Sequence, residues 1–189
     1  MLDKKSFAQI RKSFEIFEEK REETIQNSRG IIQLSKKIIY DIHRNDLKSA
    51  SIGIKKIKLS LKKISTQKYD TGIDSVAQQE YVEAIVFYEF VKNEKIPTHT
   101  QLKVSAHNYL MGLCDLTGEL GRHCVNQAIK RDYKEVFRTK DLVDEIYGEF
   151  LKFNLRNSDL RKKSDAIKWN LKKIEDLVYS IKTKSTNYQ

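Results

Sequence analysis

Two pairs of carboxylates stand at helical spacing in largely apolar segments. Glu80 and Glu83 are three residues apart in AQQEYVEAIVFYEFV, and Asp115 and Glu119 are four apart in MGLCDLTGELGRH. On a helix, either spacing places both acids on one face. Acids crowded together in an apolar setting repel each other and lose hydration, so they need a cation. A lysine, an arginine or a divalent metal ion could supply it.

A shared metal site follows if the two segments face each other. Four carboxylates would then converge, and oxygen-only ligands favour hard cations such as Mg²⁺, Mn²⁺ or Ca²⁺. Gly112 and Gly118 would let a neighbouring backbone approach, which would offset their cost in a helix. Arg122 follows Asp115 on the same face and could hold a phosphate beside the metal. The alternative is that the acids are solvated and Arg122 pairs with Glu119.

Several other chemistries do not match the sequence. No histidine follows a glutamate at the Glu-x-x-His spacing of di-iron bundles, and the second acidic pair has the wrong order for an all-α nucleotide pyrophosphatase. The chain has no P-loop, no Gly-x-Ser-x-Gly motif and no zinc-binding pattern. Cys114 and Cys124 are too far apart on one helix to form a disulfide, and we expect them to be buried in a protein of a reducing compartment. Glu89 points away from Glu80 and Glu83 and is expected to be an ordinary surface or interface charge.

The composition indicates a single all-α domain spanning residues 1–189. Pro97 is the only proline and there are seven glycines, which is fewer turn-forming residues than strands joined by tight turns need. The formal net charge of +10 suits a polyanionic partner, although lysine- and isoleucine-rich chains are also common in AT-rich or thermophilic genomes. The N-terminus has no signal-peptide pattern and no segment is apolar enough to span a membrane, so we expect a cytoplasmic protein.

Hydrophobic periodicity predicts a bundle of six or seven helices with a very long first helix. Residues 4–44 form one helix or two nearly continuous ones. Asn45 or Asp46 caps a second helix with an a/d heptad from Leu47 to Ile64, and a loop follows at 66–72. Later helices are predicted at 73–92, from Thr98 or Thr100 to about 130, from Thr139 and from Ser158, with a short extra helix at 131–137.

The middle of the first helix, EEKREETIQNSR at 18–29, is polar on all sides. Such a stretch leaves the core and faces solvent, a partner or a ligand. Its basic residues Lys20, Arg21 and Arg29, together with Arg122, are expected to bind nucleic-acid phosphates.

Four segments resemble the translin family. The most distinctive are QEYVEA at 79–84 and YLMGLCDLTGELGRHCVN at 109–126, where DLTGEL is followed by an arginine two residues on. KREETIQNSRGIIQLSKKIIYDIHR at 20–44 and YSIK at 179–182 also resemble that family. The resemblance covers nearly the whole chain, with weaker support at 46–70 and 131–160.

The resemblance implies a compact seven-helix bundle that assembles into a closed octameric barrel with RNA inside. In this family, subunits of the TRAX type (translin-associated factor X) are Mg²⁺-dependent endoribonucleases that prefer single-stranded RNA, whereas translin-type subunits bind RNA and single-stranded DNA. The TRAX acids match Glu80, Glu83, Asp115 and Glu119. A short chain that keeps them is similar to archaeal members, which build a homo-octamer from one type of subunit.

Three hypotheses therefore remain open from the sequence. The first is an endoribonuclease in which the four acids bind Mg²⁺ or Mn²⁺ and hydrolysis leaves a 5′-phosphate and a 3′-hydroxyl. The second is a non-catalytic protein that binds RNA or single-stranded DNA, with the acids paired to lysines. The third is a structural helical oligomer whose charge reflects its genome.

Overall fold

The computed structural model describes residues 2–62 and 69–186, and these form seven α-helices. The predicted all-α bundle with a long first helix is confirmed. The helices are α1 (Lys4–His43), α2 (Leu47–Leu61), α3 (Ile73–Asn93), α4 (His99–Leu102), α5 (Ala106–Ile129), α6 (Tyr133–Phe150) and α7 (Asp159–Thr186). Ile64 and residues 66–68 of the loop predicted at 66–72 lie outside the described residues.

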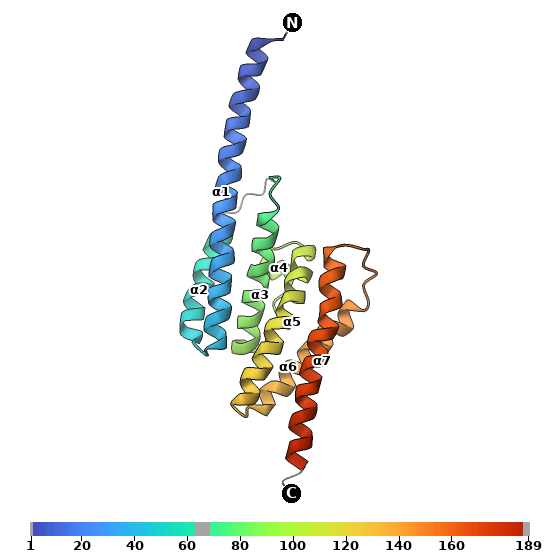
Figure 1. Ribbon diagram of the computed structural model, residues 1–189. Helices are drawn as coiled ribbons and strands as arrows, with labels where there is room; N and C mark the ends of the chain where they lie inside the picture. The colour runs from blue at the N-terminus through green and yellow to red at the C-terminus, as the bar shows by residue number, and fades with distance from the viewer. Residues whose placement is uncertain (1, 63–68, 187–189) are drawn as a thin grey trace.

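The helices pack in an order that places α3 and α5 at the centre. α1 packs against α2 on one side and α3 on the other, α3 packs against α5, and α5 packs against both α6 and α7. Figure 1 shows the long helices running roughly along one axis, with α2 at one edge of the bundle and α6 and α7 at the other. The two segments that carry the acidic pairs are therefore neighbours.

Polar caps set most helix starts, as the sequence predicts. The Asp46 carboxylate accepts a hydrogen bond from the Ser49 backbone N–H at the start of α2. Thr98 forms a capping box with Gln101, but the helix it opens, α4, ends after one turn. Lys103 then takes a left-handed conformation with φ 58°, and Ser105 caps α5 separately. The prediction of one helix from Thr98 or Thr100 to about residue 130 was wrong.

The region after α5 also differs from the prediction. The short helix expected at 131–137 and the helix expected from Thr139 are one element, α6, capped by Asp132. Thr139 is fully buried inside α6, and its hydroxyl donates to the Glu135 carbonyl. Threonine satisfies its hydroxyl in this way within a helix, so a cap-type residue at this position did not mark a start.

The hydrophobic core runs through the centre of this arrangement and supports α3 from both sides. Phe87 of α3, Ile31 of α1, and Leu116 and Leu120 of α5 are fully buried. Almost every residue from Tyr81 to Phe90 is buried, as expected for a helix that is apolar on all sides. In the described part of the chain, no helix is long and apolar enough to cross a membrane.

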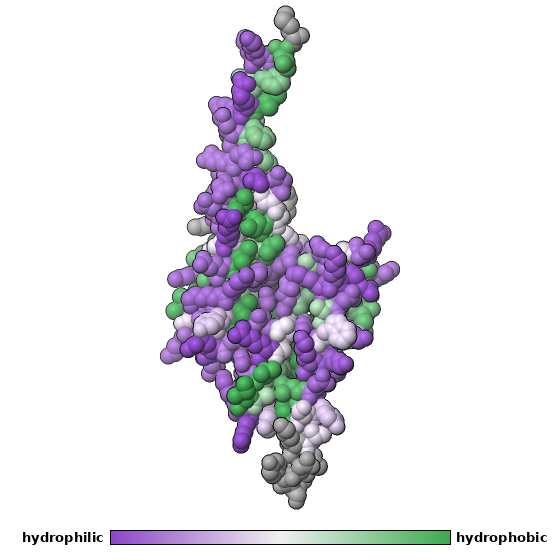
Figure 2. Space-filling model, in the orientation of Figure 1, coloured by the Kyte–Doolittle hydropathy of each residue, from purple (hydrophilic) through white to green (hydrophobic). Residues whose placement is uncertain are grey.

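The first half of α1 extends beyond the body of the molecule (Figure 1). It exposes large apolar side chains at Phe7, Ile10, Phe14 and Ile16, and Figure 2 shows hydrophobic residues as a green band along one side of the projection. Phe7, Ile10 and Phe14 share one face of the helix, whereas Ile16 lies on roughly the opposite face. Further along α1, the Phe17 ring centre lies 5.2 Å from that of Tyr69. An apolar stripe of this kind indicates a surface that contacts another molecule.

Candidate active site

The α3 pair consists of two carboxyl groups without a cation partner. Glu83 is buried, with 8% of the residue exposed, and Glu80 is half-buried. Neither forms a hydrogen bond or an ion pair with any residue in 2–62 or 69–186. Burial, followed by the charges of Asp115, Glu80 and Glu119, raises the pKa of Glu83 to about 8. Burial also raises the pKa of Glu80, and the charge of Lys36 opposes that shift.

The α5 pair is hydrogen-bonded by side chains from distant helices. The Lys163 ammonium of α7 donates to Asp115 Oδ2 at 2.5 Å and to Gln79 Oε1 at 3.3 Å. The His43 imidazole of α1 lies 2.5 Å from Glu119 Oε2 through Nε2. This hydrogen bond is the main reason that the pKa of Glu119 is lowered. Within one site, the two pairs thus have opposite electrostatic environments.

The histidine side of the site is a cluster of three rings that meet at tilted and edge-to-face angles. Phe87 lies with its ring centre 5.0 Å from that of His43 and 5.5 Å from that of His123. The Asn126 amide lies 3.4 Å from His43 Nδ1, so donation to this nitrogen would leave the ring proton on Nε2. The Nε2 proton would then point at the Glu119 carboxylate, which can accept it in a hydrogen bond.

A single glycine explains how closely α3 and α5 approach. A Cβ atom at Gly112 would lie 2.7 Å from the Gln79 backbone carbonyl oxygen and 2.7 Å from Val82 Cβ, so only glycine fits there. The same role was predicted for Gly118, and that prediction was wrong. Its nearest neighbour would be Asn170 Nδ2 at 3.8 Å, and a Cβ at Gly121 would meet nothing within 4 Å. The structure does not explain these two glycines.

The four predicted acids share one electrostatic neighbourhood, but they do not form a ready metal cluster. Asp115 and Glu119 both act on Glu80 and Glu83, although they belong to a different helix. Among the residues that the structure describes, no three histidine, cysteine, aspartate or glutamate side chains are arranged to hold a metal ion. Lys163 and His43 hold the α5 carboxylates instead. A metal site at these acids therefore remains a prediction.

The basic residues predicted to bind nucleic acid lie at several places. Arg122 is exposed, and its guanidinium is 4.0 Å from Glu119, as the alternative interpretation expected. Arg21 pairs with Asp70 at 2.7 Å and Lys20 with Glu23 at 2.9 Å. Arg29 is exposed on α1. Their contact with nucleic acid stays a prediction.

Sequence reasoning missed the side chains that hold the two α5 acids. Lys163 is 48 residues from Asp115 in the chain, and His43 is 76 residues from Glu119. Helical spacing reveals only neighbours on the same helix, so no local pattern could identify either residue. Gln79, next to Glu80, was also missed.

The two cysteines take no part in this chemistry. Both are buried and free, as predicted. Burial raises the pKa of each thiol, Cys114 and Cys124, to about 12, which keeps both in the unreactive thiol form at neutral pH.

Comparison with known proteins matches this chain to the translin family and to several of its relatives. The model of the translin family matches residues 19–185. An uncharacterised protein of Methanocaldococcus jannaschii is 33% identical over 165 residues, covering 81% of this chain and 72% of that protein. Translin-associated protein X of Pongo abelii is 24% identical over 234 residues, covering 98% of this chain and 79% of that protein. The match to chicken translin is 36% identical over 80 residues, which is 42% of this chain and 35% of that relative.

Solved structures show the same architecture. The chain is similar to apo-NeC3PO with a TM-score of 0.87 and 28% identity, covering 95% of this chain and 97% of that one. It is similar to AfC3PO, solved with duplex RNA, with a TM-score of 0.88 and 26% identity, covering 96% and 99%. Because the family model spans most of the sequence and these folds superpose over nearly their whole length, the chain belongs to the translin family.

Proposed function

We propose that this protein is a divalent-metal-dependent endoribonuclease that hydrolyses single-stranded RNA. The observation that carries the proposal is Glu83, a buried carboxyl group with a raised pKa and no cation partner among the described residues. Unpaired buried acids are costly to keep, and such perturbed groups concentrate at functional sites. Glu80, Asp115 and Glu119 are its neighbours and would act with it. The match to Translin-associated protein X supports this assignment.

The donor set fits a hard cation. All four side chains offer carboxylate oxygens, the ligands that Mg²⁺ and Mn²⁺ prefer. An ion bound there would act as a Lewis acid on the phosphodiester and on the attacking water. Glu80 and Glu83 are free to turn toward such an ion, whereas Asp115 would first have to leave Lys163.

The remaining residues of the site would handle the RNA. Once released from Asp115, the Lys163 ammonium could pair with a phosphate next to the acids. Arg122 is exposed beside Glu119 and could hold a second phosphate bidentately. His43 would keep Glu119 ionised and oriented through its hydrogen bond. Lys20, Arg21 and Arg29 would add attraction for the backbone at a distance from the acids.

We further propose that the chain assembles into a homo-octameric barrel that encloses these acids. The exposed apolar side chains on the projecting half of α1 support a contact between subunits. The protein is expected in the cytoplasm, where reducing conditions suit its two free cysteines. Light scattering gives a direct measurement: a fully active monomer of 22.2 kDa would refute the enclosed barrel and leave the acidic site untouched.

A second candidate function is non-catalytic binding of RNA or single-stranded DNA. It is favoured by the two α5 acids, which already have Lys163 and His43 as protein partners, and by the lack of a preformed metal cluster in the described part of the chain. In this case the acids would be structural and the net charge of +10 would attract the polyanion.

The experiment compares cleavage and binding of a labelled single-stranded RNA. Wild-type protein should cleave in Mg²⁺ and not in EDTA. Glu83→Gln should lose at least ~100-fold in rate while its RNA affinity in EDTA stays within about twofold, because distributed basic residues provide most of the binding. Glu145→Gln, an exposed acid on α6, is the matched control and should cleave normally. Wild-type-like cleavage by Glu83→Gln would remove Glu83 from the mechanism, and binding without cleavage by the wild type would favour the second function.

A further inference from the structure

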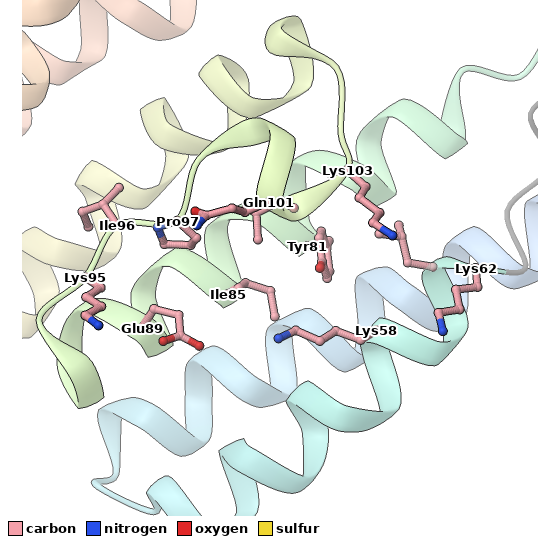
Figure 3. Close-up of a pocket in the computed structure, with 12 residues that line it drawn as sticks. Lys58, Lys62, Tyr81, Ile85, Glu89, Lys95, Ile96, Pro97, Gln101 and Lys103 are labelled. Carbon is pink, nitrogen blue, oxygen red and sulfur yellow. The ribbon is translucent and has the colours of Figure 1, made fainter.

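A cavity of about 610 Å³ opens on the side of α3 that faces away from the acids. Tyr81, Ile85 and Glu89 recur every four residues on α3 and line it, whereas Glu80 and Glu83 point to the opposite side of the same helix. Figure 3 shows these three side chains between α2 and the segment 95–103. The cavity is therefore separate from the candidate active site, and its volume is in the range of small-molecule sites.

The floor of the cavity is apolar, with two polar groups available. Leu61, Ile85, Ile96 and Leu102 provide aliphatic surface. Tyr81 is 3% exposed, and its hydroxyl has no hydrogen-bond partner among residues 2–62 and 69–186. The Gln101 side-chain oxygen accepts from the Thr98 N–H, and its amide nitrogen has no partner in the same described ranges. A flat ring with polar edges would satisfy both groups.

The rim of the cavity is strongly basic. It has four lysines, which are Lys58 of α2, Lys62 directly after α2, Lys95 after α3, and Lys103 after α4. Within the described residues, none of the four forms an ion pair. Glu89 is the one acid of the lining, and Asn93 Nδ2 donates to its carboxylate at 2.5 Å. The formal charge of the described lining is thus +3, and Figure 3 shows Lys58 reaching from α2 across the space toward Glu89.

We propose that this cavity binds a free nucleotide that carries two or three phosphate groups. The base would lie on the apolar floor and receive hydrogen bonds from Tyr81 and Gln101, and the phosphates would pair with the lysines at the rim. A fatty acid would bring one negative charge and would leave the Tyr81 hydroxyl and the Gln101 amide unsatisfied. The proposal is independent of RNA cleavage, because it uses residues on the other side of α3.

Calorimetric titration of the full chain in EDTA tests this site without contribution from a metal. The ligands are ATP, AMP, adenosine, inorganic tripolyphosphate and oleate. Lys58→Gln/Lys62→Gln removes two rim charges. Lys55→Gln/Lys56→Gln removes two charges from the same helix outside the lining and is the matched control, since any basic protein attracts polyanions. Tyr81→Phe removes one hydroxyl and keeps the ring.

We expect ATP to bind more tightly than AMP, and AMP more tightly than adenosine. The Lys58/Lys62 double variant should bind ATP at least tenfold more weakly, and Tyr81→Phe roughly threefold more weakly, while the Lys55/Lys56 variant stays within twofold. Circular dichroism and thermal melting establish that each variant is folded. Three results would each overturn the nucleotide assignment. The first is an equal loss of ATP affinity in both double variants. The others are tripolyphosphate binding as tightly as ATP, and oleate binding tightly while ATP binds weakly.

Discussion

The two acidic pairs show how carboxyl groups behave with and without a hydrogen-bonding partner from another helix. On α5, Asp115 is held by Lys163 and Glu119 by His43, and the pKa of Glu119 is lowered. On α3, Glu83 lies deep among apolar residues with no such partner in the described chain, and its pKa is raised to about 8. The α5 pair is satisfied by the fold itself, whereas the α3 pair has free capacity for a ligand. This contrast favours the α3 carboxyl groups as the ones that bind a ligand.

Replacing Glu83 should produce the largest change in stability. Its folded pKa of about 8 exceeds the ordinary value of 4.5, so the folded state binds more protons than the unfolded state between these values. Wild-type stability should therefore fall as the pH rises from 4.5 to 8. Glu83→Gln removes this pH-dependent loss of stability. Its free energy of unfolding should exceed that of the wild type by about 3 kcal/mol at pH 9 and differ little from it at pH 4. Chemical denaturation in EDTA at both pH values measures this.

Glu145→Gln is the control for that comparison, because Glu145 is exposed on α6. Parallel pH profiles for the wild type and Glu83→Gln would mean that Glu83 is not an unsatisfied acid. The contrast between the two pairs would then disappear.

The next largest effect should come from Gly112, which sets the distance between the pairs. Gly112→Ala would place a Cβ 2.7 Å from a backbone oxygen of α3, so the two helices must separate. We expect a loss of roughly 2 kcal/mol in the free energy of unfolding. Gly118→Ala is the matched control on the same helix and should be neutral or stabilising by up to about 1 kcal/mol. Equal effects of both changes would show that Gly112 does not control helix separation.

His43→Phe tests the α5 pair, in which Glu119 already has a hydrogen-bond partner. Phenylalanine keeps a ring against Phe87 but removes the hydrogen bond to Glu119. Because the folded pKa of Glu119 is lowered, its contribution to stability is present above pH 4.5 and is lost as the pH falls further. The variant should lose about 1.5 kcal/mol at pH 7, and the difference should narrow below pH 4. Thermal unfolding across this range is the measurement, with exposed His107→Phe as control.

Lys163→Met should have the smallest effect on stability and the most informative effect on metal binding. The side chains of Lys163 and Asp115 are each 35% exposed, so the ion pair should contribute no more than about 1 kcal/mol. Removing the ammonium should let Mn²⁺ bind several-fold more tightly, because a competing cation is gone. Calorimetry with Lys162→Met as control measures this. Weaker Mn²⁺ binding would show that Lys163 does not compete for this position.

The sequence predicted the parts of the fold that depend on local pattern. The apolar run after Ile73 and the long periodic segment before His43 gave α3 and α1 nearly to the residue. The break between α4 and α5 was missed because it depends on Lys103, which adopts a left-handed conformation without being glycine. α6 was divided because Thr139 resembles a cap while its hydroxyl bonds within the helix.

For the site, spacing identified the four acids but not their surroundings. α7 brings Lys163 to Asp115 and α1 brings His43 to Glu119, and only tertiary packing determines that these acids, and not Glu83, receive such partners. The cavity beside Tyr81 was missed for the same reason, since its lysines come from three separate segments.

The projecting half of α1 has a consequence for folding cooperativity. α1 is continuous in geometry, yet its first buried residue is Thr24. The turns from Lys4 to Ile16, roughly 20 Å of helix, depend on their own backbone hydrogen bonds, which are marginal in water for so short a segment. In a single chain, their amides should exchange with solvent by local fraying, whereas those after Ser28 should exchange when the bundle opens. One helix would then behave as two units of very different stability.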